Sequence, residues 1–361
     1  MNKYVVFGGF LGAGKTTSMI AFSEYLRKTG RSPAILVNDL GAKNLVDGEF
    51  TAYAGCCCDT ITGGCICYKT GELVEALRRF RDTSKADIVF SDIPGCGIGA
   101  LDHVYHALAQ QYPDEFHICP FVAVADPERL RAIMPEKANL NLPEEMRYLF
   151  DAQLKEAEVI ILNKIDLLTP DERREYREFL ENTYPGRRVF LISAKTREGV
   201  GEAAEYLYGA KSKLPVVDIG YGGKEFIAAE TRMSWYNRKF FSKSETPIDG
   251  NAFIRDLFAD ISRRLRDAGR NVPHLKIFVS GDKGETAKAS LVGIDYDTVF
   301  DLSFKNPQKN LRVILNARAA CESEVLDFLM DGAIRAVCEK YELSVHVCFT
   351  ECFGMMDEGL E

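Results

Sequence analysis

The stretch VVFGGFLGAGKTT, residues 5–17, constrains the fold more than any other part of the sequence. A β-branched segment runs directly into a glycine-rich loop, and a helical pattern, SMIAFSEYLRKTG, follows it. The loop fits the spacing G-x-x-x-x-G-K-T, in which glycines let backbone N–H groups surround phosphates and the lysine neutralises them. The helix adds the positive end of its dipole. We therefore predict a nucleotide site whose phosphate-binding residues are Gly9, Gly12, Ala13, Gly14, Lys15, Thr16 and Thr17.

A second buried-strand pattern, ADIVFSDIPG over residues 86–95, ends in the spacing Asp92-x-x-Gly95. The Asp92 carboxylate can hold a magnesium ion, usually through water, and the Gly95 N–H can sense the terminal phosphate. Thr16 in the phosphate loop can offer its hydroxyl to the same ion. We therefore predict Mg²⁺ as a cofactor, held near Thr16 and Asp92.

Two more buried strands, VIILNKID (159–166) and VFLISAK (189–195), also end in polar residues. The Asp166 carboxylate can accept hydrogen bonds from guanine N1–H and the exocyclic amine, a pair that adenine does not present. A backbone N–H after the second strand can meet guanine O6. Four such motifs lie at the carboxyl ends of strands, where open α/β sheets bind ligands. The sequence therefore predicts GTP, with base-side residues Asn163, Lys164, Asp166, Ser193, Ala194 and Lys195.

Helical patterns separate these strands, over roughly residues 99–111, 142–157, 170–182 and 199–208. This alternation predicts an α/β domain whose mainly parallel, doubly wound sheet has helices on both faces. We expect this domain to cover residues 1–212.

The C-terminal part reads as a different architecture. A glycine- and proline-containing linker over 213–224 precedes a smaller α+β domain over 225–352, and an acidic tail covers 353–361. We expect FIAAETRMSW (226–235) to open this domain as a strand. Two long helical patterns among the strands indicate split βαβ units. By analogy alone, since this part carries no catalytic motif, we expect the domain to recognise a partner or cofactor.

The stretch AGCCCDTITGGCICY, residues 54–68, holds five of the eleven cysteines. In an extended segment Cys56 and Cys58 face one way, and Cys65 and Cys67 form a second same-side pair. If the chain folds over between the pairs, four thiolates can surround one tetrahedral ion. Thiolates favour Zn²⁺, which we take as the default, although copper(I) and an iron–sulfur centre stay open. A reversible redox switch and inert packing are the alternatives to this metal site.

Composition limits the partners. The net charge of −8 argues against nucleic acid as a partner, and no apolar run reaches the length needed to cross a membrane. The short apolar run at the start leads into a glycine loop rather than a cleavage site, so we predict a cytoplasmic protein with reduced thiols. Eleven cysteines, five of them crowded together, make a disulfide framework a poor explanation.

The segments GGFLGAGKTT, VNDLG, GGCIC, VAVADP and ILNKIDLL together resemble the CobW/HypB/UreG family of P-loop GTPases, most closely its CobW-like branch. The resemblance covers most of residues 3–195 and implies a GTP-hydrolysing metallochaperone or metal insertase. Its usual C-x-C-C metal motif falls on Cys65 and Cys67, with Tyr68 in the place of the third cysteine. Asp39 and Asp92 stand where this branch commonly has glutamates, so the resemblance adds Asp39 to the catalytic carboxylates.

The resemblance implies a client metalloprotein as partner, and the sequence leaves a homodimer open. Two other functions are open as well: a GTPase accessory of a cobalamin- or corrinoid-dependent system, and a thiol-based redox or metal sensor. Cys96 follows Gly95, where several small GTPases carry a glutamine that orients water, so we expect slow hydrolysis without a partner. Cys96, His103 and His106 are candidate extra metal ligands, although a lone i, i+3 histidine pair is more often solvated.

Overall fold

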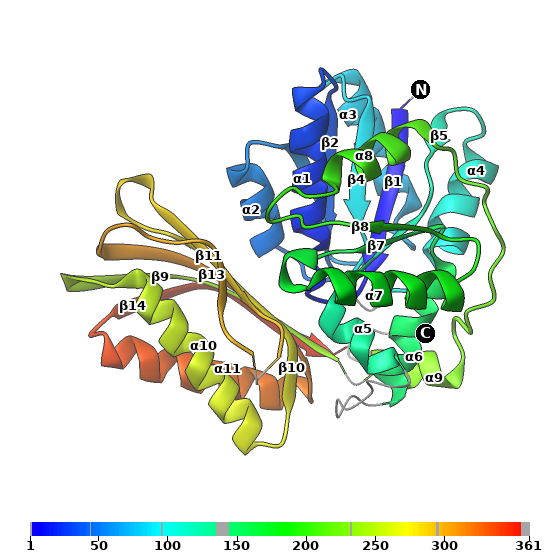
Figure 1. Cartoon of the computed structure of the whole chain (residues 1–361). Coiled ribbons are helices and arrows are strands. Elements are labelled where there is room, and N and C mark those ends of the chain that lie inside the picture. Colours follow the sequence, from blue (N-terminus) through cyan, green and yellow to red (C-terminus); the bar gives the residue numbers. More distant parts are fainter. Residues whose placement is uncertain are drawn as a thin grey trace. The chain divides into compact units, whose positions relative to one another are not determined.

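The computed structural model describes residues 2–43, 45–94, 97–134, 144–231, 233–293 and 296–354. These residues form two compact units (Figure 1). The first contains the described residues up to Ala42 and Thr51–Ala229, and the second contains Lys43–Phe50 and the described residues from Glu230 onward. Each unit has its own sheet.

The sheet of the first unit is parallel in every recorded strand pair, in the order β3-β2-β4-β1-β6-β7-β8 with β5 beside β1. Most of its strand residues are buried, as expected for a sheet covered on both faces. The strands are β1 (Asn2–Gly9), β2 (Pro33–Asn38), β3 (Cys57–Ile61), β4 (Ile88–Asp92), β5 (Phe116–Ile118), β6 (Val122–Ala125), β7 (Val159–Leu162) and β8 (Arg188–Leu191).

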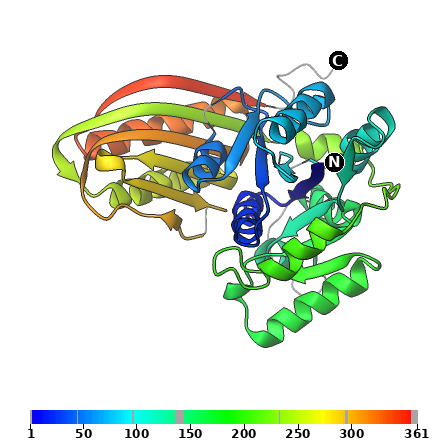
Figure 2. The same ribbon diagram turned by 90° about the horizontal axis from the view of Figure 1, so that it is seen from above.

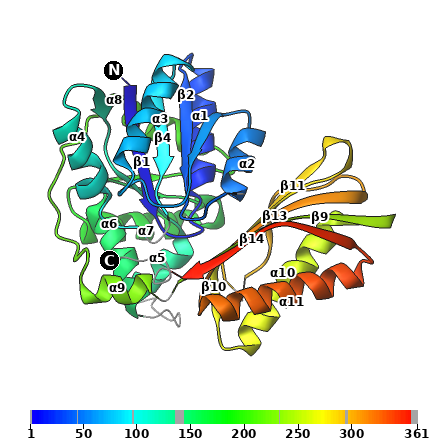
Figure 3. The same cartoon turned by 180° about the vertical axis from the view of Figure 1, so that it is seen from behind.

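Helices cover both faces of this sheet, with α1 and α8 on one face and α3 on the other (Figures 1 to 3). The α/β architecture expected from the sequence is thus confirmed. The helices of this unit are α1 (Lys15–Lys28), α3 (Thr70–Asp82), the π-helix η1 (Leu101–His106), α4 (Ala107–Gln111), α5 (Pro127–Ile133), α6 (Glu144–Glu156), the 3₁₀ turn η2 (Ile165–Leu167), α7 (Pro170–Thr183), α8 (Val200–Gly209) and α9 (Lys224–Glu230). Helix α2 (Val46–Tyr53) is divided between the two units, with residues 46–50 in the second and 51–53 in the first.

The second unit is an antiparallel sheet in the order β12-β11-β10-β13-β9-β14. Because β13 lies between β9 and β10 and is antiparallel to both, β9-α10-β10 is a split βαβ unit, and β13-α11-β14 repeats the pattern around β9. The expected α+β domain is therefore confirmed. Its elements are β9 (Ser234–Ile248), α10 (Gly250–Asp267), β10 (Asn271–Ser280), η3 (Asp282–Gly284), β11 (Thr286–Leu291), β12 (Val299–Leu302), β13 (Gln308–Ala320), α11 (Ser323–Lys340) and β14 (Ser344–Gly354).

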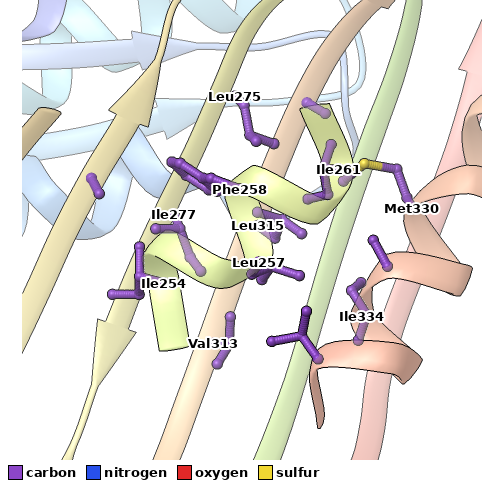
Figure 4. Packing of buried hydrophobic residues seen from close by; sticks show 14 of the residues in the cluster. Ile254, Leu257, Phe258, Ile261, Leu275, Ile277, Val313, Leu315, Met330 and Ile334 are labelled. Atoms are coloured by element: carbon purple, nitrogen blue, oxygen red, sulfur yellow. The ribbon is translucent and has the colours of Figure 1, made fainter. Parts of the chain in front are cut away.

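The core of the second unit lies between the sheet and the two long helices, α10 and α11 (Figure 4). Ile254, Leu257 and Ile261 recur at helical spacing on one face of α10 and are at most 1% exposed. Val313 and Leu315, two residues apart on β13, meet them from the sheet. The alternation that buries these side chains turns the residues between them toward the other face.

An eight-residue segment, Lys43–Phe50, belongs to this second unit although it is far away in the sequence. Asp47 pairs with Lys276 of β10 at 2.5 Å, and Glu49 pairs with Arg312 of β13 at 2.5 Å. The Val46 N–H donates to Asn316 Oδ1 of β13 at 2.8 Å. Since these sheet residues alternate with core residues, the segment lies on the sheet face opposite the helices.

One segment forms a different element from the one expected. Residues 226–230, expected to begin a strand, belong to α9, and the strand that follows begins at Ser234. The alanine-containing stretch FIAAE has good helix formers, which outweigh its apolar residues.

The predicted linker also bonds to the first unit rather than hanging free. The Lys213 N–H donates to Glu158 Oε1 at 2.8 Å, and the Tyr148 hydroxyl donates to the Ile219 carbonyl at 2.5 Å. The unit boundary therefore falls near residue 229, not at the predicted residue 212.

No helix within the described ranges is long and apolar enough to cross a membrane.

Candidate nucleotide and metal site

The phosphate loop joins β1 to α1, and its side chains bond to the loop itself. Lys15 donates from Nζ to the carbonyl of Gly9 at 2.8 Å and to that of Phe10 at 3.2 Å. Gly14 has φ of 94°, and a Cβ there would lie 2.5 Å from Asn163 Nδ2. Only glycine fits this close approach and this left-handed conformation. The phosphate loop is therefore closely packed against Asn163, the residue that follows β7.

The residues after β7 hold the phosphate loop from the base side. The Asn163 side chain donates from Nδ2 to the Ala13 carbonyl at 2.8 Å and accepts from the Ala194 N–H at 2.9 Å. Lys164 donates from Nζ to the Gly12 carbonyl at 2.7 Å. One asparagine therefore ties together the loops after β1, β7 and β8.

Asp166 and Ser193 form the part of the base side that can read a purine. Ser193 is buried, and its hydroxyl donates to Asp166 Oδ1 at 2.6 Å. This bond orients the carboxylate of Asp166, which is itself exposed. The Ala194 N–H is used by Asn163, so in this structure it positions the loop rather than facing O6 of a base. The carboxylate is suited to the two donors of guanine.

Asp126, which sequence reasoning placed in the segment VAVADP without a role, supports the same loops. It begins α5 by accepting from the N–H groups of Glu128 and Arg129, and it pairs with Arg129 Nη1 at 2.8 Å. Complete burial alone would raise the pKa of the Asp126 carboxyl, but the charges of Arg129 and Lys164 outweigh burial and lower it. Asp126 is thus an anion that fixes the Lys164 ammonium group, 3.9 Å away.

The expected magnesium residues lie at the carboxyl ends of neighbouring strands. Asp92 ends β4 and Thr16 lies in the first turn of α1, and each is 6% exposed. Asp39 directly follows β2, and its Oδ1 accepts from the Gly41 N–H at 2.9 Å. A hydroxyl and two carboxylates are oxygen donors of the kind that Mg²⁺ prefers. Gly95 and Cys96 lie outside the described residues.

The structure separates the five crowded cysteines into two groups, contrary to the four-thiolate prediction. Cys56 and Cys58 lie at the start of β3, where Cys58 pairs with Ile35. Cys65 and Cys67 come after the other end of the strand, and the four residue steps from Cys57 to Ile61 set the two ends of the strand about 13 Å apart. Within the described ranges, no three His, Cys, Asp or Glu side chains gather in a way that could hold a metal ion.

The reason for this separation is that CCDTI forms a strand beside β2 instead of folding back. β3 pairs with β2 in parallel over five residues, so its two ends point to opposite edges of the sheet. The turn at Gly63 and Gly64 comes after the strand and returns the chain to the end of β2, not to its start. Of the four predicted thiolate ligands, all of them among the described residues, Cys65 and Cys67 therefore lie at the nucleotide edge of the sheet and Cys56 and Cys58 do not.

Asn38 holds the loop that carries Cys65 and Cys67. Its Nδ2 donates to the carbonyls of Ile61 at 3.1 Å and Gly64 at 2.8 Å, and its Oδ1 accepts from the Ile66 N–H at 3.0 Å. Its own N–H donates to Asp92 Oδ1 at 2.8 Å. In the sequence this residue stands out only as part of the segment VNDLG. Its role could not be predicted, because hydrogen bonds to a loop 23 or more residues away leave no local pattern.

The two thiols of this loop lie close together and are mostly covered. The Cys67 N–H donates to Cys65 Sγ at 3.4 Å. The hydrogen bond between the side chains and burial raise the pKa of the Cys67 thiol well above its ordinary value. In the absence of a metal the Cys67 side chain is therefore a neutral thiol, which must lose its proton to bind one.

A buried carboxylate, which sequence reasoning missed, accepts hydrogen bonds from the segment that follows β4. Glu156 ends α6, is 2% exposed, and accepts from the N–H groups of Gly99 at 2.9 Å and Leu101 at 2.8 Å. Burial raises the pKa of Glu156 to about 7 in spite of these bonds. The carboxyl group fixes the start of η1, the π-helix that carries His103.

Among the residues that the structure describes, neither candidate histidine joins a cluster of potential metal ligands. His103 packs against Tyr221 with ring centroids 4.6 Å apart and lies 5.9 Å from the Tyr68 ring, while the two tyrosine hydroxyls bond to each other. His106 Nε2 lies 3.3 Å from the Pro215 carbonyl oxygen. Tyr68 thus takes part in an aromatic group in the place where the resemblance expected a third cysteine.

Comparison with known proteins identifies the family. A model described as the CobW/HypB/UreG nucleotide-binding domain matches residues 3–190, just over half of the chain. The zinc chaperone YeiR of Escherichia coli is 27% identical over 191 residues, which cover 52% of this chain and 54% of that protein. The zinc chaperone CobW of Pseudomonas aeruginosa is 25% identical over 214 residues, covering 53% and 56%.

The chain therefore spans about half the length of the curated relatives that it matches. The solved structure of Zn(II)-bound YjiA GTPase from Escherichia coli aligns over 92% of this chain and 99% of that chain, with 15% identity and a TM-score of 0.35. The chain belongs to the CobW/HypB/UreG family, with its nucleotide-binding domain in residues 3–190.

Proposed function

We propose that this chain binds and slowly hydrolyses GTP and uses the nucleotide cycle to control a metal ion held by Cys65 and Cys67, which it delivers to a client metalloprotein. One observation carries the proposal. Asn38 bonds through its N–H to Asp92 at 2.8 Å and through its side chain to the loop that holds both thiols. A single buried residue therefore touches both the nucleotide side and the thiol side of the site.

The nucleotide roles follow from placement. Lys15 stabilises the charge of the transferring phosphoryl group, and Thr16, Asp39 and Asp92 hold the magnesium ion. Bound Mg²⁺ supplies charge neutralisation at the phosphate oxygens. Asp166 selects guanine. Hydrolysis without a partner is slow, because Cys96 follows Gly95 where a water-orienting glutamine would otherwise stand.

The cargo follows from the two thiols. Thiolates favour soft or borderline ions, and Zn²⁺ takes four ligands in closed protein sites. With Tyr68 in place of a third cysteine, the chain offers two thiolates and leaves the remaining positions for water or for ligands of the client. Such a half-filled site suits transfer better than storage. Two of the relatives carry the name zinc chaperone, which supports Zn²⁺ as the cargo.

Two other functions fit less well. A thiol redox sensor needs a reactive thiolate, but burial raises the pKa of Cys56 to about 11, and the pKa of Cys67 is also raised. An accessory of a corrinoid-dependent system would use the same GTP groups with a cobalt cofactor as cargo. We place the protein in the cytoplasm, where its thiols would stay reduced, and a homodimer is compatible with the proposal.

The test is the affinity for Zn²⁺, measured by competition with a chromophoric chelator, with and without a non-hydrolysable GTP analogue and Mg²⁺. We expect the nucleotide to change the affinity by at least about fivefold, within the usual range of coupling between sites. Linkage requires Zn²⁺ to change the affinity for the analogue by the same factor.

Asp166→Asn is the matched control. It should raise the analogue concentration needed for half-saturation by about a hundredfold, because the two guanine donors lose their carboxylate acceptor. It should leave the Zn²⁺ affinity measured without nucleotide unchanged. Tight Zn²⁺ binding that ignores the nucleotide would mean a structural site and would end the delivery proposal. No binding of Zn²⁺ with binding of a cobalt corrinoid would favour the corrinoid alternative.

A further inference from the structure

Asn38 is the last residue of β2 and is 3% exposed. Its side chain makes three hydrogen bonds, and all three end on backbone groups of residues 61–66. Two of the bonds need a donor and one needs an acceptor. A primary amide supplies this combination at a single branch point, whereas a carboxylate or an aliphatic side chain of the same size does not.

The hydrogen bonds of the Asn38 side chain hold the backbone next to both thiols. Gly64, whose carbonyl accepts from Asn38 Nδ2, directly precedes Cys65. Ile66, whose N–H donates to Asn38 Oδ1, lies between Cys65 and Cys67 and is fully buried. The amide therefore fixes the backbone on which both sulfur atoms are carried, without touching either sulfur atom in a recorded bond.

The main chain of the same residue faces the nucleotide side. The Asn38 N–H donates to Asp92 Oδ1, and the residue after Asn38 is Asp39, the other expected magnesium carboxylate. The Asp39 N–H donates to the Ile61 carbonyl at 3.2 Å, the same carbonyl that accepts from Asn38 Nδ2. A shift of either carboxylate thus changes hydrogen bonds that hold the thiol loop.

We propose that Asn38 is the positioning residue through which the nucleotide state sets the geometry of Cys65 and Cys67. The inference rests on the proposed function, because it assumes that these thiols bind metal and that GTP changes their affinity. Asn38 neither binds the metal nor contacts the nucleotide in this account. It passes displacement of Asp92 and Asp39 to the thiol loop, because its N–H bonds to Asp92 while its side chain bonds to the backbone of that loop.

The experiment measures Zn²⁺ affinity in the full chain, with and without a non-hydrolysable GTP analogue, for the wild type, Asn38→Asp and Asn38→Ser. Asn38→Asp keeps the shape but places an oxygen against the two carbonyls, so we expect at least tenfold weaker Zn²⁺ binding. The factor by which the analogue changes Zn²⁺ affinity should fall to about one. Asn38→Ser adds no charge and should also abolish that factor, which keeps the test valid if the aspartate variant does not fold.

Asn237→Asp is the matched control. Asn237 is a fully buried asparagine of β9 whose Oδ1 accepts from Asn316 and Arg318, so it suffers the same chemical change far from these residues in the sequence. It should keep the wild-type coupling factor. Loss of coupling in this control as well would mean general destabilisation and would overturn the role of Asn38.

The outcomes also separate the two proposals. If the wild type shows no Zn²⁺ binding or no coupling, the proposed function fails, and the role of Asn38 fails with it. If the wild type is coupled and both Asn38 variants fold and retain the full coupling factor, the proposed function stands and the role of Asn38 is wrong. Retained GTP-analogue affinity, within about threefold, shows that the variants act on the link and not on nucleotide binding itself.

Discussion

The two ends of β3 carry the same kind of residue in very different surroundings. At its start, Cys57 is exposed and Cys56 lies near α1, where Arg27 donates to the neighbouring Gly55 carbonyl at 2.7 Å. Beyond its end, the loop with Cys65 and Cys67 is fixed by Asn38 beside the expected magnesium carboxylates. Five thiols that are crowded in sequence are therefore divided by one short strand.

The difference shows that function depends on which edge of a parallel sheet a residue reaches. Every nucleotide motif of this chain lies after the carboxyl end of a strand, and the Cys65–Cys67 loop does too. Cys56 directly precedes the strand and Cys58 is its second residue, so both lie toward the opposite edge. Their thiols fit a packing role, since burial raises the pKa of Cys56 to about 11 and also raises the pKa of Cys58.

The largest effect should come from removing each pair of thiols in turn. We expect the double variant Cys65→Ser and Cys67→Ser to lose at least about a hundredfold in Zn²⁺ affinity, because hydroxyls are poor ligands for this ion. The matched double variant Cys56→Ser and Cys58→Ser should stay within about threefold of the wild type. Equal losses in the two variants, measured by chelator competition, would restore the four-thiolate site and break the comparison.

A smaller effect should appear in the rate of alkylation by iodoacetamide at pH 8, followed by mass spectrometry. A thiol whose pKa is raised from 9.0 to about 11 is mostly protonated at this pH, and only the thiolate reacts. Cys56 should therefore react at least about ten times more slowly than the exposed Cys57. Added Zn²⁺ should protect Cys65 and Cys67 and leave the rate at Cys57 unchanged.

The control for alkylation is the unfolded chain in urea, in which the five thiols should react at similar rates. Protection of Cys57 by Zn²⁺ in the folded chain would contradict the separation of the two groups.

The smallest effect tests the turns at the two ends of the strand. Gly55 and Gly63 have nearly the same left-handed conformation, φ of 69° and 67°, and a Cβ at either would meet no atom within 4 Å. Alanine at each should cost about 1 kcal/mol of unfolding free energy, because side chains disfavour this conformation. Gly63→Ala should also weaken Zn²⁺ binding by a few fold, since the Gly63 N–H bonds to the Gly41 carbonyl at 2.9 Å.

Gly55→Ala is the matched control for this last prediction, and its Zn²⁺ affinity should equal that of the wild type. Chemical denaturation gives the stability of both variants. An equal loss of Zn²⁺ affinity in both would mean that the thiol loop responds to general stability and not to its own turn.

Much of the fold could be predicted because its signals are local. The strand, loop and helix around Lys15 follow from residue types that are adjacent in sequence, and the residues after β7 do so as well. Pro170 at the first position of α7 and the capping box of Thr169 with Glu172 mark a helix start in the same way. Family resemblance added Asp39, which no local pattern would have distinguished.

The features that escaped prediction depend on pairing between distant segments. The cysteines of β3 were expected to fold over because nothing in CCDTI specifies that it pairs with β2. The roles of Asn38 and Glu156 rest on bonds to residues 23 and more positions away. Residues 226–230 were expected to form a strand because short apolar runs fit both structures, and α9 follows their helix propensity.

The segment Lys43–Phe50 determines when the second unit can finish folding during synthesis. Its partners in the second sheet are 229 to 270 positions away, at Lys276, Arg312 and Asn316. A ribosome makes the segment long before it makes those strands, so the second unit cannot complete its sheet face until nearly the whole chain has been synthesised. A fragment that begins at the apparent boundary near residue 230 would lack this covering segment and would leave Lys276 and Arg312 without their carboxylate partners. Although the strands of its sheet follow one another in sequence, the second unit is therefore complete only with a segment from the N-terminal part of the chain.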